Sequence, residues 1–155
     1  MVLAAGQLAR RLGVPLHTVG TLSASKIADA QSQQEGTWGL IMSLFAGANV
    51  INHATGWLEG GLVTSFEKTM MDADLCGKLC RFFEGIDLSE NAQAMDAIAA
   101  TGPGQHFLGS EHTQANFLTA LFRPDLADNN SYEQWQADGQ LGMTQRANAL
   151  WKDRL

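Results

Sequence analysis

The stretch that decides the fold is SKIADAQSQQEGTWGLIMSLFAGANVINHAT, residues 25–55. From Ser25 to about Gly47 a stripe recurs at helical spacing, which predicts a long helix capped by Ser25. The members of this stripe are Ile27, Gln31, Gln34, Trp38, Ile41 and Phe45, with Leu40 and Leu44 beside it. ANVINHAT, residues 48–55, then fits a strand bounded by Gly47 and Gly56. A helix that leads into a strand is typical of a parallel βα unit.

The flanking sequence extends the same alternation on both sides. VLAAGQLARRLG, residues 2–13, is predicted to be a helix that stops at Gly13-Val14-Pro15. LHTVG, residues 16–20, is predicted to be a short strand, and the glycines of residues 56–62 indicate a loop. The first half therefore alternates helix, strand, helix, strand and helix, as α/β folds do.

From the last helix of this alternation onward, only helices are predicted. Thr64-Ser65-Phe66-Glu67 fits a capping box with Glu67 at the third helical position. The helix that follows, to about Phe83, is apolar on nearly two faces and is expected to be covered on both sides. Its two cysteines, Cys76 and Cys80, are expected to be small buried thiols in a reducing compartment.

Three further helix starts are predicted beyond that helix. Asp87-Leu88-Ser89-Glu90 fits a capping box for a short helix that ends at Gly102-Pro103. Ser110 is predicted to cap a helix of about ten residues, ending before Pro124. Residues 131–134, SYEQ, fit a third box and a helix to the C-terminus, which two glycines, at 139 and 142, weaken.

Composition excludes several classes of partner. The formal net charge is −6 and the ten Lys and Arg residues are scattered, which disfavours nucleic acid and anionic membranes. The longest apolar-rich stretch is shorter than the roughly 20 residues of a membrane span. The charged pair Arg10–Arg11 follows the first apolar residues, the reverse of an export signal, so we expect a cytoplasmic protein.

The histidine-rich stretch GPGQHFLGSEHT, residues 102–113, does not have the spacing of a metal motif. His106 and His112 are six residues apart with Gly109-Ser110 between them, whereas a zinc helix places its histidines four apart. We therefore predict a loop-to-helix junction and no metal site.

A small-ligand pocket is predicted at the carboxyl ends of the two strands, where α/β folds gather binding groups. His53 lies near the end of the second strand, and Trp57 and Glu59 follow in the glycine-rich loop. Aromatic faces and carboxylates there would favour a cation. A buried structural His53 is the alternative, and Thr21 and Ser23 after the first strand fit a turn and a cap.

Several separated stretches closely resemble the trimethylamine methyltransferase family. They are SKIADAQSQQEGTWGLIMSLFAGANVINHATGWLEGGLVTSFEK, GPGQHFLGSEHT and FRPDLADNNSYEQW, and they occur in the family's order. The resemblance implies an α/β fold: the C-terminal portion of a (β/α)8 TIM barrel with additional C-terminal helices. Residues 1–101 would hold the last βα units, and residues 102–155 a helical segment packed on them.

The resemblance also implies an activity. Family members move a methyl group from a methylated amine to the cobalt of a corrinoid (cobalamin) carried by a partner protein. This sequence shows no pyrrolysine, as in members that demethylate quaternary amines such as glycine betaine. The substrate-binding residues that we predict are His53, Trp57, Glu67, Asp29 and His106. No catalytic residue is assigned.

Two other hypotheses stay open. The chain could be a non-catalytic half-barrel, an assembly or small-ligand-binding module in which two copies close one sheet, and we expect a homo-oligomer. It could also be a metal-dependent hydrolase that uses His53, His106 and His112.

Overall fold

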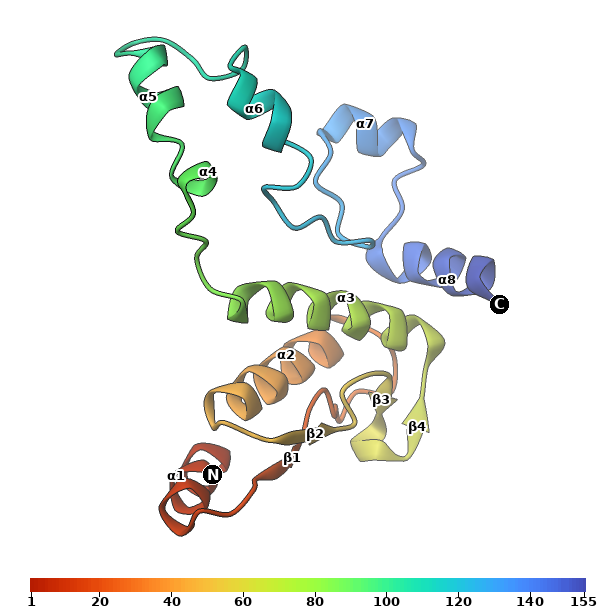
Figure 1. Cartoon of the computed structure of the whole chain (residues 1–155). Coiled ribbons are helices and arrows are strands. Elements are labelled where there is room, and N and C mark those ends of the chain that lie inside the picture. The colour runs from red at the N-terminus through yellow and green to blue at the C-terminus, as the bar shows by residue number, and fades with distance from the viewer. The chain divides into compact units, whose positions relative to one another are not determined.

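The computed structural model describes residues 1–155, which form two compact units (Figure 1). The first unit joins Met1–Leu79 to Pro124–Leu155, and the second is Cys80–Arg123. The first contains α1 (Val2–Leu12), β1 (His17–Val19), α2 (Ala30–Phe45), β2 (Val50–Asn52), β3 (Trp57–Leu58), the 3-10 helix η1 (Glu59–Gly61), β4 (Val63–Thr64), most of α3 (Phe66–Phe83), α7 (Tyr132–Ala137) and α8 (Met143–Arg154). The second contains α4 (Glu90–Gln93), α5 (Met95–Thr101) and α6 (Glu111–Asn116). The predicted boundary at residue 101 stays a prediction.

The strands β1 and β2 pair in parallel, with Thr18 opposite Ile51 at the centre of the register. This confirms the parallel pairing that the alternation predicts. The helix α1 ends where expected, because Gly13 adopts a left-handed conformation (φ 65°) and its N–H closes the last turn.

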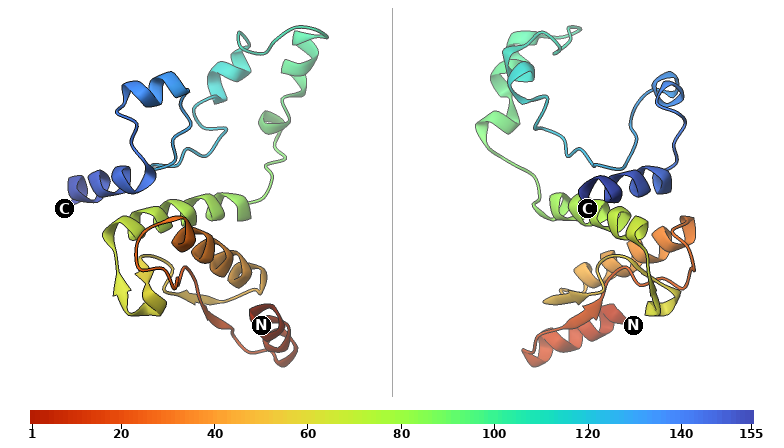
Figure 2. Two further views of the ribbon diagram at one scale, coloured as in Figure 1. Left: turned by 180° about the vertical axis from the view of Figure 1, so that it is seen from behind. Right: turned by 90° about the vertical axis from the view of Figure 1, so that its right-hand side faces the viewer.

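The helix α2 lies against β1 on one side and α3 on the other (Figure 2). The buried face consists of three small residues, Ser32, Gly36 and Ser43, together with Leu40. Most of the predicted stripe is not buried, because Ile27, Trp38 and Phe45 are exposed, whereas Leu40 beside the stripe is buried. Small side chains are favoured on the buried face because the helix lies close to the sheet. Ser43 Oγ, for example, donates to Val19 O at 2.9 Å.

The start of α2 also differs from the prediction. Asp29, not Ser25, is the N-cap: its carboxylate accepts from Ser32 N at 2.9 Å, and Ser32 Oγ accepts from Asp29 N at 3.0 Å. Ser25 supports this cap by donating to Asp29 Oδ1 at 2.9 Å.

The glycine-rich loop contains a small antiparallel hairpin, which the sequence analysis missed. Trp57 pairs with Thr64 and Leu58 with Val63 around η1. The turn is fixed to the segment before α2, because Glu59 N donates to Ser25 O and Gly60 N to Ser23 O, both at 2.8 Å.

The helix α3 begins one residue later than its predicted capping box. Ser65 Oγ accepts from Lys68 N at 3.3 Å, so Ser65 is the cap and Glu67 occupies the second helical position. The prediction of Glu67 at the third position is therefore wrong. The buried-thiol prediction is wrong as well, since Cys76 is half-buried and Cys80 is exposed.

The main apolar cluster joins α3 to the C-terminal segment. Met71, Leu126 and Ala147 are buried together, with Met70, Met143 and Leu150 packed around them. The predicted single C-terminal helix is two helices, because Gly139 (φ 93°) and Gln140 (φ 58°) interrupt it. Ser131 caps α7 as predicted, although Gln134 pairs with Asp138 and does not complete the box.

Short helices form the second unit. Ala94 (φ 49°) separates α4 from α5, and Ser89, not Asp87, caps α4. Ser110 caps α6 as predicted, but the helix has six residues where about ten were expected. No helix of the protein combines the length and apolar character of a membrane span.

Candidate functional site

The candidate site lies where the carboxyl ends of the parallel strands β1 and β2 meet. The ladder continues past β1 and β2, because Gly20 N donates to Asn52 O at 2.8 Å and Thr21 N to His53 O at 2.9 Å. Thr21 and His53 therefore lie side by side at the edge where α/β proteins place their binding groups.

A fully buried ion pair lies directly behind this edge. Lys68 Nζ on α3 is 2.8 Å from both carboxylate oxygens of Asp72, one helical turn away, and neither side chain is exposed to solvent. A buried ion pair is stable only when its remaining hydrogen-bonding capacity is satisfied.

The carboxylate of Asp72 meets that condition. It accepts hydrogen bonds from Thr21 Oγ1 at 2.9 Å, Gly56 N at 2.8 Å and Gln33 Nε2 at 3.2 Å. These donors come from the end of β1, the loop after β2, and α2. The carboxylate of Asp72 therefore fixes the end of β1, the loop after β2 and the helix α2 relative to α3.

Glycine makes room for the lysine. A Cβ on Gly36 would be 3.1 Å from Thr21 Cβ and 3.3 Å from Lys68 Nζ. The nearest face of α2 is therefore bare backbone, which lets the ammonium group sit between α2 and α3.

His53 and Trp57 form an aromatic pair at the same edge. Their rings meet edge to face, with centroids 4.8 Å apart and planes at 78°. His53 is exposed, so the alternative of a buried structural histidine is wrong. Its backbone is left-handed (φ 52°), a conformation that costs free energy in a non-glycine residue and is common at functional sites.

Two carboxylates near the start of α2 accept hydrogen bonds from their neighbours: Asp29, which is a predicted site residue, and Glu35. The N–H of Ser32 is the main cause that lowers the pKa of Asp29 from its ordinary 3.8. The side chain of Gln31 is the main cause that lowers the pKa of Glu35, which also accepts from Ser23 Oγ at 2.8 Å. Both groups are ionised at neutral pH, and Asp29 as a substrate contact stays a prediction.

Glu67 connects α3 to α8. Its Oε1 accepts from Asn148 Nδ2 at 2.6 Å and Trp151 Nε1 at 2.8 Å, and Oε2 accepts from Ser65 Oγ at 2.8 Å. These donors, Asn148 first, lower the pKa of Glu67 from 4.5 to about 2. Phe66 stacks on Trp151 beside them at 4.8 Å. The role of Glu67 as a pocket wall stays a prediction.

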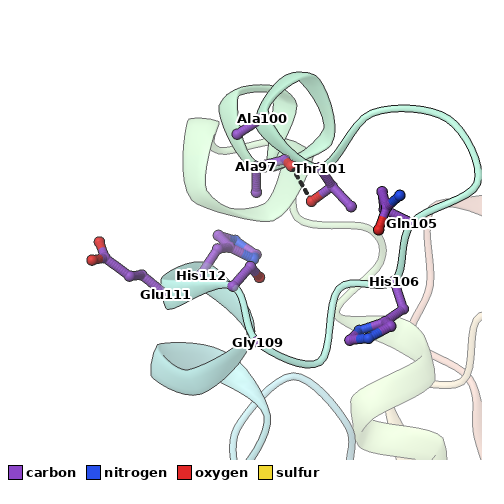
Figure 3. Close-up of a pocket in the computed structure, with 9 residues that line it drawn as sticks. Ala97, Ala100, Thr101, Gln105, His106, Gly109, Glu111 and His112 are labelled. Carbon is purple, nitrogen blue, oxygen red and sulfur yellow. Dashed lines mark hydrogen bonds between the residues drawn. The ribbon is translucent and has the colours of Figure 1, made fainter.

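His106 belongs to the second unit, where it lines an open pocket of about 630 Å³ together with His112 and Thr101 (Figure 3). His112 Nε2 is 2.7 Å from Asn91 O. Glu111 also lines the pocket but extends away from His106 (Figure 3). The structure therefore brings His106 together with His112, and His53 together with Trp57.

All 155 residues match the trimethylamine methyltransferase (MTTB) family. The chain belongs to this family. It is 37% identical over 152 residues to a glycine betaine methyltransferase of Desulfitobacterium hafniense (strain Y51), which covers 98% of this chain and 32% of that protein. It is 32% identical over 136 residues to the trimethylamine methyltransferase MttB of Methanosarcina thermophila, covering 88% and 28%.

A third relative is MttB2, a trimethylamine methyltransferase of Methanosarcina mazei, 31% identical over 152 residues with coverages of 98% and 30%. The chain thus spans about a third of the length of the curated family members that it matches.

In this family member the ion pair of Lys68 and Asp72 was not predicted from the sequence, although a signal was available. Lys68 and Asp72 are one helical turn apart, in a helix whose apolar residues predict cover on both sides. This spacing predicts an ion pair, but Asp74 and Lys78 have the same spacing, so the sequence could not show which of the two pairs is fully buried.

The structure contains no group of three or more His, Cys, Asp or Glu side chains that could hold a metal ion. The metal-dependent hydrolase hypothesis, which needs His53 of the first unit and both His106 and His112 of the second, stays a prediction.

Proposed function

We propose that this chain is part of a methyltransferase that moves a methyl group from a methylated amine to the cobalt of a corrinoid carried by a separate protein. The observation that carries the proposal is the family match over the whole chain. The chain would be the C-terminal portion of a (β/α)8 barrel, with β1 and β2 in its last βα units, and the parallel register supports that placement.

A quaternary amine such as glycine betaine is the substrate class that we favour. The identity to the glycine betaine methyltransferase, 37%, exceeds the 32% and 31% to two trimethylamine methyltransferases. A quaternary amine also needs no activation, because it leaves as a neutral tertiary amine when it loses a methyl group.

The corrinoid, when bound to its own protein, supplies a reduced cobalt that accepts the methyl group. The residues of this chain fit the amine, since the edge offers an aromatic pair in which His53 is exposed and Trp57 is half-buried. Their task is to hold and orient the cation, which is catalysis by positioning.

Within that task, Trp57 and His53 would contact the ammonium group. A cation over an aromatic ring gains about 0.5–2 kcal/mol. The pair formed by Lys68 and Asp72 would keep Thr21 and the loop at Gly56 in place, as a positioning element that does not touch the substrate.

Calorimetric titration with glycine betaine tests the proposal. The matched ligand is 3,3-dimethylbutanoate, which has the same shape and carboxylate but no positive charge. We expect betaine to bind and the analogue that lacks the ammonium group to bind at least tenfold more weakly. Trp57→Leu should weaken betaine binding by roughly 2- to 30-fold, which is the cation–π energy converted to affinity. Equal binding of both ligands would refute a cation site.

A second candidate function is the half-barrel assembly module, favoured by one observation. The β1–β2 sheet has only two strands, so the outer edge of each strand has no strand partner. Light scattering during size exclusion tests it: a dimer that does not bind betaine supports assembly, and a monomer that binds betaine rules it out.

A further inference from the structure

The second unit, Cys80–Arg123, has no buried residue of its own. Every large apolar side chain in it is exposed to solvent, with exposed fractions from 42% to 87%. These residues, which we call the second-unit apolar set, are Phe82, Phe83, Ile86, Leu88, Met95, Ile98, Phe107, Leu108, Phe117, Leu118, Leu121 and Phe122.

Such a segment cannot be stable in isolation. Burial of apolar surface is the main term that offsets the entropy lost on folding, and segments this short rarely supply enough of it even when they have a core. This many exposed large apolar side chains in one segment indicate an interaction site. A further surface must therefore cover the second-unit apolar set.

The character of the set indicates a permanent partner. Interfaces that form and dissociate resemble ordinary protein surface in polarity, whereas permanent ones resemble a domain core cut in half. Twelve large apolar side chains with no buried member fit the permanent kind. A corrinoid protein that docks and leaves in each cycle does not fit it.

Charge disfavours a second copy. The second unit has two basic residues, Arg81 and Arg123, against five acidic ones, so its formal net charge is −3. Two copies meeting through this surface would bring like charges together. Length points to another occupant, because about two thirds of each relative has no counterpart in this chain.

We propose that the second-unit apolar set is a permanent interface for the polypeptide that corresponds to the part of the family's length outside these 155 residues. This proposal rests on family membership and is independent of the methyl-transfer activity and of the substrate.

Co-expression tests the proposal. The 155-residue chain is produced alone and with the portion of the Desulfitobacterium hafniense glycine betaine methyltransferase that it does not match. Light scattering and hydrogen exchange are then measured on both samples. We expect a one-to-one complex in which amides of residues 80–123 exchange at least tenfold more slowly than in the chain alone.

Three outcomes would overturn the proposal. They are a homodimer in which residues 80–123 are protected, a monomer in which they are protected, and a complex in which they exchange as in the chain alone. A failure of betaine binding with a protected complex would leave this proposal standing and count against the proposed substrate only.

A pair of variants separates apolar contact from charge. Leu121→Asp and Ala120→Asp add the same charge to neighbouring exposed positions, but only the first removes a member of the set. We expect Leu121→Asp to weaken the complex at least tenfold and Ala120→Asp to weaken it much less. Equal weakening would contradict an apolar interface at this position. All four tryptophans lie in the first unit, so their fluorescence checks independently that its fold is intact.

Discussion

Asp72 is the residue whose replacement we expect to cost the most stability. Asp72→Asn leaves Lys68 fully buried beside a neutral amide, and an uncompensated buried charge costs about 3–5 kcal/mol. Urea unfolding followed by tryptophan fluorescence measures this free energy of unfolding in the first unit.

The matched control for Asp72 is Asp125→Asn, which breaks an ion pair with Arg154 that is exposed on both sides. Exposed pairs contribute little, so the unfolding curve should barely move. If both variants lost the same stability, the buried pair would not be the element that fixes the edge. The double variant Lys68→Met/Asp72→Leu should recover part of the loss, because it leaves no unpaired charge.

Glu67 gives the first unit a defined sensitivity to acid. Its pKa is about 2 in the folded protein against an ordinary 4.5, so the folded state favours the ionised form. The stability from this carboxylate is therefore present above pH 4.5 and lost as the pH falls from 4.5 to 2. We expect Glu67→Gln to lose about 1–2 kcal/mol at pH 7, since hydrogen bonds to a charged group are the stronger kind and partial exposure reduces them.

The pH series supplies its own check on Glu67. Unfolding curves of the wild type and of Glu67→Gln should approach each other between pH 4.5 and pH 2. Trp151, whose indole N–H donates to Glu67 at 2.8 Å, is the local reporter. A difference between the two proteins that stays constant down to pH 2 would mean that Glu67 does not titrate in this range.

Among the elements, α2 depends on a bare glycine where it meets the sheet. A Cβ on Gly39 would overlap the carbonyl oxygen of Gly20, a backbone atom that cannot move aside. Gly39→Ala should therefore destabilise the first unit by about 1–3 kcal/mol, even though alanine has the higher helix propensity. Gln34→Ala, at an exposed position of the same helix, is the control and should leave stability unchanged or raised in thermal unfolding.

Elements that local sequence controls could be predicted, and those that tertiary contacts control could not. Gly13-Val14-Pro15 stops α1 through its own backbone geometry, and β1 and β2 pair in parallel as the alternation predicts. The buried face of α2 was predicted only in part: Leu40 beside the stripe is buried, but close approach to the sheet selects small residues in place of the larger members of the stripe. The β3–β4 hairpin is held by hydrogen bonds to Ser23 and Ser25, which no local pattern reveals.

In the candidate site, too, contacts between residues close in sequence could be predicted, and contacts between distant residues could not. His53 and Trp57 could be placed together because both follow the end of one strand by a few residues. The partners of Glu67 could not, since Asn148 and Trp151 are more than 80 residues away in sequence.

For the whole molecule, the discontinuous first unit has a consequence under proteolysis. The segments Met1–Leu79 and Pro124–Leu155 form one unit, while Cys80–Arg123 contributes no buried residue. A glutamate-specific protease should therefore cut first at the exposed Glu84, Glu90 and Glu111 of the second unit. It should cut later at Glu59 and Glu133, which are exposed but belong to η1 and α7 of the first unit, and later or not at all at the half-buried Glu35 and Glu67.

The nicked protein should stay together after these cuts. Residues from the two segments, Met71 on one side and Leu126 and Ala147 on the other, share one apolar cluster, and Glu67 binds α8 across the gap. We expect fragments 1–84 and 112–155 to co-elute from size exclusion and to separate in urea. Separation without urea would mean that the C-terminal segment is not an integral part of the first unit. The nicked Glu67→Gln variant should separate at a lower urea concentration than the nicked wild type, because it lacks the carboxylate that bridges the two segments.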